Sequence, residues 1–240
     1  MNIIIAKDYA ALSEKAARII IETVRAKPDA VLGLATGTTP LGLYKRLIAD
    51  HKENGTSYKH IRAVNLDEYK GLPKDHPQSY AYFMRKNLFD HIDIDVNNTY
   101  IENGMAEDDQ AECKRYDEIL EKYPRDIQLL GLGSNGHIAF NEPNTPFDSM
   151  THVVTLAEST VKDNARLFSD ISEVPRKAYT MGLKSIMQAR KIIVLANGRN
   201  KAEIVARLMY GSPSEELPAS ILYNHKDCTV ILDEDAASKL

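Results

Sequence analysis

The chain has 240 residues, a length that suits one α/β domain. Hydrophobic residues make up 43% of the chain and charged residues 27%, so we expect a full hydrophobic core and exclude wholesale disorder. The net charge is -4 and the basic residues form no long run, which argues against nucleic acid as the main partner.

Cysteine usage and hydropathy indicate a cellular compartment. Cys113 and Cys228 lie far apart and outside any CxxC pattern, which disfavours both a disulfide framework and a cysteine-rich zinc site. The N-terminus carries charge too early for a signal peptide, and no apolar run approaches membrane-spanning length. We therefore expect a cytoplasmic protein that has no membrane partner.

The first half of the chain alternates between strand and helix patterns. Residues 10–25 have helical spacing, because Leu12, Ala16, Ile20 and Val24 share one face. The elements expected in this half are strands over residues 3–6, 30–35 and 61–66, and helices over residues 10–25, 41–50, 79–89 and 106–123.

The second half continues this alternation. The expected strands cover residues 127–130, 151–156, 191–196 and 228–232, and the expected helices cover residues 159–168, 202–210 and 218–223. The pattern of residues 179–187 favours neither type. Strands that alternate with helices along the chain predict a mostly parallel sheet covered on both faces. No repeat or linker is visible, so we expect a single domain over residues 1–240.

Polar side chains follow four of the expected strands. They occupy residues 36–39, 67–68, 135–142 and 197–201. In a doubly wound sheet the carboxyl ends of the strands converge on one crevice, so we expect these four segments to form one site.

The turn Thr36-Gly-Thr-Thr-Pro40 opens the helix expected over residues 41–50. Helix N-termini present free N–H groups and a partial positive charge, which favour a phosphate. The turn lacks the GxxxxGK[ST] spacing of a P-loop. An ordinary capping turn is an equal alternative.

The segment after residues 127–130 contains Gly131, Gly133 and Gly136, which fit the spacing of a dinucleotide fingerprint. That fingerprint also requires a helix directly after its last glycine. His-Ile-Ala-Phe-Asn-Glu-Pro follows instead, and it has no amphipathic period. His137 with Asn135 and Glu142 nearby favours proton transfer over a histidine that only satisfies backbone groups.

Two further groups are candidates for function. Asp67 and Glu68 follow apolar residues, which favours a general base or a metal ligand over an exposed acidic pair. Arg166 and Lys201 are candidate phosphate partners, although isolated cations are usually surface residues. Neither HExxH nor a histidine pair at ligand spacing supports a metal site.

Three segments together resemble the glucosamine-6-phosphate deaminase family. They are LATGTTPL at residues 34–41, NLDEY at 65–69 with HPQSY at 76–80, and GLGSNGHIAFNEP at 131–143. The first segment is shared in looser form with 6-phosphogluconolactonases. The resemblance implies a Rossmann-like three-layer α/β/α fold with a mostly parallel sheet. It also implies conversion of glucosamine 6-phosphate and water to fructose 6-phosphate and ammonia, with no metal, nucleotide or other cofactor.

The same resemblance implies a role for each matching residue. Asp67 would carry the proton from C2 to C1, and His137 would shuttle a proton during ring opening. Glu142 would be the charge partner of His137, and Asn135 would complete this set where many members have aspartate. An amide can bond an imidazole but cannot stabilise an imidazolium by charge. The implied phosphate contacts are Gly37, Thr38, Thr39, Arg166 and Lys201.

Two other functions compete with the deaminase. A 6-phosphogluconolactonase-like hydrolase would need no base for C–H cleavage, and a non-catalytic regulator would bind a sugar phosphate without releasing ammonia. In each case the expected partner is a small sugar phosphate, and the sequence leaves self-association open.

Overall fold

The computed structural model describes residues 1–165 and 168–240. A seven-stranded sheet forms its centre, and every pair of neighbouring strands in this sheet is parallel. In spatial order the strands are β1 (Asn2–Ala6), β10 (Cys228–Asp233), β9 (Lys191–Ala196), β6 (Ile127–Gly131), β2 (Val31–Leu34), β3 (Arg62–Asn65) and β5 (Thr99–Tyr100).

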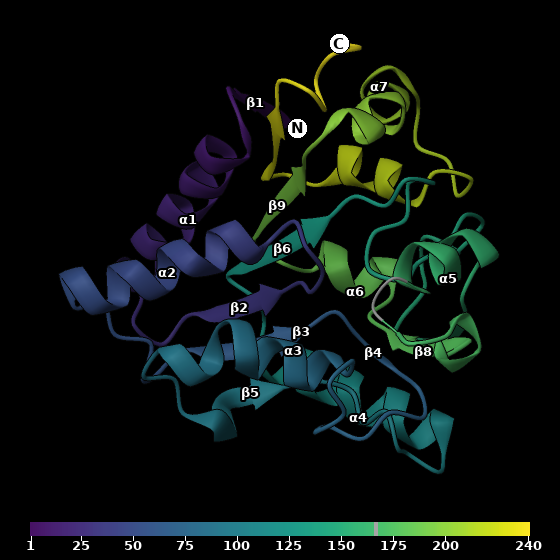
Figure 1. Ribbon diagram of the computed structural model, residues 1–240, viewed down its shortest axis with the longest axis horizontal. Helices are drawn as coiled ribbons and strands as arrows, with labels where there is room; N and C mark the ends of the chain where they lie inside the picture. Colours follow the sequence, from purple (N-terminus) through teal and green to yellow (C-terminus); the bar gives the residue numbers. More distant parts are fainter. Residues whose placement is uncertain (166–167) are drawn as a thin grey trace.

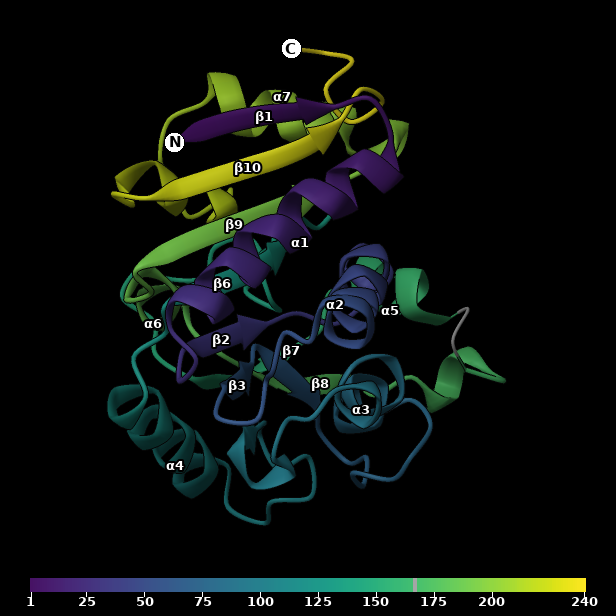
Figure 2. The same cartoon turned by 90° about the vertical axis from the view of Figure 1, so that its left-hand side faces the viewer.

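Helices lie on both sides of this sheet (Figures 1 and 2). One side holds α1 (Tyr9–Ala26), α2 (Leu41–Asn54) and α3 (Tyr80–Asn87), and the other holds α6 (Leu183–Met187) and α7 (Ala202–Tyr210). The predicted three-layer, mostly parallel Rossmann-like fold is therefore confirmed. None of the described helices combines the length and the apolar character needed to cross a membrane.

A second, antiparallel sheet stands at the edge of the first. It consists of β4 (Asp67–Tyr69), β8 (Lys177–Thr180) and β7 (His152–Thr155), in that order. Helix α4 (Asp109–Lys122) packs against β7, and α5 (Glu158–Ala165) lies near β8 in Figure 1. Five 3-10 helices complete the described elements: η1 (Phe89–His91), η2 (Val96–Asn98), η3 (Ile171–Glu173), η4 (Arg199–Lys201) and η5 (Pro218–Asn224).

The second sheet corrects the sequence prediction at one place. We expected residues 67–68 only to follow the end of the strand over residues 61–66, but the chain changes partners at Leu66 and continues as β4. The N–H of Met181 donates to the carbonyl of Leu66 at 2.7 Å, and Asp67 then pairs with Thr180. Because these partners lie more than a hundred residues away, no local pattern could show this change.

Short elements account for the other differences. Strand β5 was not predicted, and residues 179–187, which we left unassigned, divide between the end of β8 and helix α6. Helix α2 runs four residues beyond its predicted end, to Asn54, where Gly55 ends it with a φ of 71°. A left-handed glycine is a common helix terminator because it carries no Cβ.

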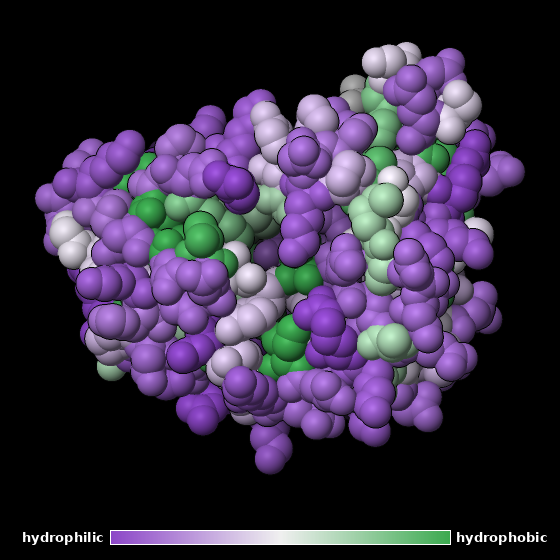
Figure 3. All heavy atoms as spheres, turned by 90° about the horizontal axis from the view of Figure 1, so that it is seen from below, coloured by the Kyte–Doolittle hydropathy of each residue, from purple (hydrophilic) through white to green (hydrophobic). Residues whose placement is uncertain are grey.

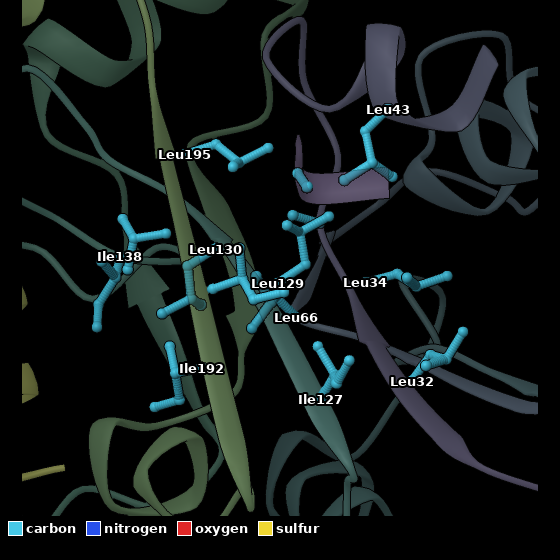
Figure 4. Packing of buried hydrophobic residues seen from close by; sticks show 14 of the residues in the cluster. Leu32, Leu34, Leu43, Leu66, Ile127, Leu129, Leu130, Ile138, Ile192 and Leu195 are labelled. Atoms are coloured by element: carbon cyan, nitrogen blue, oxygen red, sulfur yellow. The ribbon is translucent and has the colours of Figure 1, made fainter. Parts of the chain in front are cut away.

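Buried aliphatic side chains fill the space on both faces of the central strands. Figure 4 shows Leu34, Leu129 and Ile192 among packed neighbours from adjacent strands. All four residues of β2 are buried, so this strand reads as a continuous apolar run. Each fully buried aliphatic side chain contributes roughly 1.5–3 kcal/mol. The face seen in Figure 3 is mainly hydrophilic, with separate apolar patches.

The strand order reverses between β2 and β6. From β2 the chain continues outward through β3 to β5, and from β6 it continues the other way through β9 to β10. The connections therefore diverge and leave a crevice at the carboxyl ends of β2 and β6, the usual place for ligands in open α/β sheets.

Candidate active site

A cavity of about 780 Å³, here called the cleft, lies at this crevice. Its walls come from the segments that follow β2, β3, β6 and β9, together with part of α5. The predicted convergence of four strand ends is therefore confirmed. The predicted site residues that line the cleft are Gly37, Thr38, Thr39, Asp67, His137 and Lys201.

The turn between β2 and α2 forms one end of the cleft. No side chain caps α2, and the Thr39 hydroxyl donates instead to Oδ1 of Asn197 at 3.0 Å. The hydroxyl of Tyr9 donates to the Thr39 carbonyl at 2.9 Å and accepts the Gly42 N–H at 2.8 Å. The threonine side chains therefore do not cap α2, and contacts with Tyr9 and Asn197 hold the turn in place. This arrangement favours the phosphate interpretation of the turn.

The glycine loop after β6 brings His137 into the cleft. A Cβ on Gly133 would lie 2.4 Å from ring atoms of His137, so only glycine leaves room for this imidazole. Gly136 has a φ of 89°, a left-handed conformation that side chains rarely adopt. No helix or strand follows until β7, so the helix that a dinucleotide fingerprint requires is missing here, as the sequence indicated.

A hydrogen-bonded carboxylate lies behind His137. Oε2 of Glu142 accepts from the Asn135 amide at 2.6 Å, and Oε1 accepts from the Thr160 hydroxyl at 2.6 Å. Nδ1 of His137 lies 3.7 Å from Oε2, too far for a hydrogen bond but close enough for ionic attraction once the imidazole is protonated.

The ionisation of Glu142 follows from these contacts. Burial acts to raise the pKa of the carboxyl, but His137 and the hydrogen bonds from Thr160 and Asn135 outweigh it and lower the pKa to about 2. Glu142 is therefore a fixed negative charge at neutral pH. Such a charge stabilises an imidazolium and can orient the ring of His137.

Asp67 lies on the cleft wall, with only 6% of its surface exposed. Burial, followed by the charge of Glu68, raises the pKa of Asp67 to about 8. A buried carboxylate with a raised pKa is a stronger base than one in water. Beside it, the rings of Tyr80 and Phe140 stack at a centroid distance of 5.9 Å and form an aromatic part of the same wall.

A third buried carboxyl, Glu102, lies near enough to Asp67 and Glu68 to feel their charges. Its residue is 0% exposed, and neither of its oxygens has a hydrogen-bond partner. Burial and then the charge of Asp67 raise the pKa of Glu102 well above its usual value of 4.5.

Within the part of the chain that the structure describes, no group of three or more His, Cys, Asp or Glu side chains could hold a metal ion.

The raised pKa of Glu102 predicts a pH-dependent stability. The folded state keeps this proton above pH 4.5 while the unfolded state loses it, so stability falls as pH rises toward the folded pKa. Glu102→Gln removes this titration. We expect a gain over wild type of roughly 2–4 °C in Tm at pH 9, the shift that ~1 kcal/mol gives at this size, and a smaller gain at pH 4. Thermal unfolding of both proteins across pH, with exposed Glu53→Gln as the control, measures it. Equal pH slopes in the two proteins would contradict the prediction.

The structure describes one of the two predicted phosphate-binding cations, Lys201. Lys201 ends η4, directly before α7, and lines the cleft. A cation at that place opposes the dipole of α7, and an anion bound between them would relieve this opposition. Arg166 lies outside the described residues.

Sequence reasoning assigned no role to several residues that shape the cleft. Thr160 bonds Glu142 from 18 positions away. Asn197 lies in the predicted segment 197–201, and it bonds Thr39 from 158 positions away. Phe140 lay inside a matched segment without a role, yet its N–H donates to the Thr180 hydroxyl at 3.1 Å and its ring reaches the cleft. No local signal marks such residues, because distant contacts create their roles.

Comparison with known proteins supplies relatives over the whole length of the chain. A glucosamine-6-phosphate deaminase of Geobacillus sp. (strain WCH70) is 54% identical and covers 99% of this chain and 95% of its own. A glucosamine-6-phosphate deaminase of Clostridium novyi (strain NT) is 51% identical, with 100% of both chains covered.

Comparison with solved structures gives a relative of the same kind. The structure of a monomeric glucosamine-6-phosphate deaminase superposes with a TM-score of 0.98 at 49% identity, over 100% of both chains. A 6-phosphogluconolactonase from Trypanosoma brucei has a TM-score of 0.79 at 24% identity over 100% of this chain and 98% of its own, which shows the shared fold alone. The profile of the family described as glucosamine-6-phosphate isomerases/6-phosphogluconolactonase matches residues 6–231. The match and the identities together place this chain in the glucosamine-6-phosphate isomerase/6-phosphogluconolactonase family.

Proposed function

We propose that this chain is a glucosamine-6-phosphate deaminase, which converts glucosamine 6-phosphate and water to fructose 6-phosphate and ammonia. Full-length relatives at about half identity carry that name. The observation that carries the proposal is the shared cleft, in which a buried carboxylate, an imidazole and a candidate phosphate turn all face one cavity. A phosphorylated substrate does not leave the cell unaided, so we place the reaction in the cytoplasm.

Ring opening is the first step that we assign. His137 moves a proton between the ring oxygen and the C1 hydroxyl, and Glu142 stabilises the imidazolium that forms in between. The Asn135 amide donates to Glu142, and its Oδ1 accepts the backbone N–H of His137 at 3.1 Å. Asn135 therefore links the carboxylate of Glu142 to the backbone that carries His137, and the negative charge comes from Glu142 alone.

Isomerisation follows on the open chain. Asp67 removes the C2 proton, which the neighbouring C1 carbonyl acidifies, and returns it to C1, while the C1 oxygen takes up a proton and the nitrogen at C2 releases one. The product carries a C=N bond at C2, and water hydrolyses this bond to a ketone and ammonia. Gly37, Thr38, Thr39, Lys201 and Arg166 hold the remote phosphate, whose binding energy positions the reacting carbons.

The alternative functions fit the cleft less well. A 6-phosphogluconolactonase shares the fold at 24% identity, but lactone hydrolysis breaks no C–H bond and gives a buried base at Asp67 nothing to do. A non-catalytic regulator needs neither this base nor the charge network behind His137.

An ammonia assay tests the proposal. Purified, chelator-treated protein should release ammonia and fructose 6-phosphate in equal amounts from glucosamine 6-phosphate, and it should turn over unphosphorylated glucosamine poorly. The same protein is assayed for hydrolysis of 6-phosphogluconolactone. Lactone hydrolysis without ammonia release would support the hydrolase, and tight binding of glucosamine 6-phosphate without turnover would support the regulator.

Removal of one phosphate contact should act mainly on KM. For Lys201→Met we expect KM for glucosamine 6-phosphate to rise roughly 10–100-fold, because a hydrogen bond to a charged group contributes about 1.5–3 kcal/mol. Steady-state kinetics measure this change. Lys191→Met is the matched control, since Lys191 pairs with Asp227 at the amino end of β9, away from the cleft. An unchanged KM in the Lys201 variant would remove Lys201 from the phosphate site.

A further inference from the structure

Glu68 is a buried carboxyl for which the mechanism above has no role. Only 1% of its surface is exposed, and three backbone N–H groups donate to its carboxylate. Oε1 accepts from Tyr69 at 2.8 Å and from Tyr80 at 2.9 Å, and Oε2 accepts from Ala81 at 2.9 Å. Because both oxygens only accept, the ionised carboxylate is the form that these donors satisfy.

These hydrogen bonds join two elements that both contribute to the cleft. Glu68 is the middle residue of β4, while Tyr80 and Ala81 open helix α3. Side chains alternate along a strand, so Asp67 reaches the cleft while Glu68 points the other way, toward α3. The carboxylate also meets the partial positive charge at the α3 N-terminus, where anions are stabilised.

We infer that Glu68 is a positioning residue, which fixes the carboxylate of Asp67 and the ring of Tyr80 on the cleft wall by fastening β4 to the first turn of α3. The inference rests on the proposed deaminase reaction. Asp67 and Tyr80 line the same cavity. Asp67 directly precedes Glu68 in β4, and the backbone N–H of Tyr80 is one of the three donors to Glu68. Loss of the carboxylate would therefore loosen the base and the aromatic wall together.

The charge of Glu68 also acts on Asp67. Burial raises the pKa of Glu68 to about 7, while its three N–H bonds and Lys74 oppose the rise. The other ionisable groups that face this pair are Tyr69 on β4, Tyr80 on α3 and Glu102 after β5. Of all these groups, Glu68 is the one whose charge raises the pKa of Asp67 after burial, so Glu68 is its main negative neighbour. Its removal should let Asp67 ionise at lower pH.

Glu68→Gln is the direct test. The amide must turn its NH₂ group toward at least one N–H donor, so at least one bond is lost. We expect kcat to fall roughly 10–100-fold, since small displacements of a reacting group cost this much. KM should stay within about threefold, because no phosphate contact changes. The acid limb of the kcat/KM profile should move to lower pH.

Glu112→Gln is the matched control. Glu112 is also buried, and it accepts from the Asn103 N–H and from Arg115. It should lose thermal stability as Glu68→Gln does, but keep both kcat and the pH profile of wild type. Ala81→Pro is a second variant, because proline fits the first turn of a helix but removes the N–H that Oε2 accepts. It should lower kcat several-fold with little change in KM.

The outcomes distinguish failure of the deaminase reaction from failure of the positioning role of Glu68. If wild type releases no ammonia, the deaminase reaction fails, and the role of Glu68 in it fails too. If wild type is active but Glu68→Gln matches Glu112→Gln in kcat and in pH profile, Glu68 is only structural and the inference is overturned. If Glu68→Gln does not fold, an Ala81→Pro variant with the kcat of wild type overturns it as well.

Discussion

Asp67→Asn is expected to lower kcat by about 10²–10⁴-fold, the usual contribution of a positioned proton-transfer group. Asparagine keeps the size of the side chain but cannot accept the C2 proton. KM should change little, because Asp67 makes no phosphate contact in the proposed mechanism. Steady-state ammonia release, together with exchange of solvent deuterium into C1 of the product, measures the loss.

The pH dependence of kcat in the wild-type enzyme should report the ionisation of Asp67. Asp67 acts as a base only when ionised, and its pKa is raised to about 8. Activity should therefore rise with pH up to about 8 and fall as pH drops below it.

Asp126→Asn is the control for Asp67→Asn, since Asp126 is buried at the amino end of β6 and accepts the Val31 N–H. Turnover of Asp67→Asn near that of wild type would remove Asp67 from the mechanism.

His137→Gln should produce the second large effect, a loss of about 10²-fold or more on the cyclic substrate. Glutamine retains hydrogen-bonding atoms but cannot carry a proton between two oxygens at neutral pH. Ring opening should then limit the rate. Exchange of solvent hydrogen into an open-chain analogue needs no ring opening, so it should fall much less.

Comparison of the two rates in one variant makes this prediction sharp. Equal losses on the cyclic substrate and the open-chain analogue would show that His137 is not specific to ring opening. His91→Gln is the matched control, because His91 is exposed and its Nε2 contacts the Lys86 carbonyl, away from the cleft. It should leave both rates at the wild-type level.

The local sequence determined the main sheet and the segments that build the cleft. Mainly apolar runs identified β2, β6 and β9, because strands buried on both faces are rich in apolar residues, although β6 also buries Gln128. The spacing of Gly133, Gly136 and His137 identified the loop, since glycine is required both at a left-handed φ and beside the imidazole. These requirements act on neighbouring residues, so they appear directly in the sequence.

The tertiary structure alone decided which partners these groups meet. Thr160 bonds Glu142 and Asn197 bonds Thr39, and neither pair is close in sequence. The sequence placed Asp67 and Glu68 together but did not separate them, whereas the fold turns one to the cleft and the other to the N-terminus of α3. The carboxyls of both residues have raised pKa values because burial removes water, and burial depends on every element packed around a group.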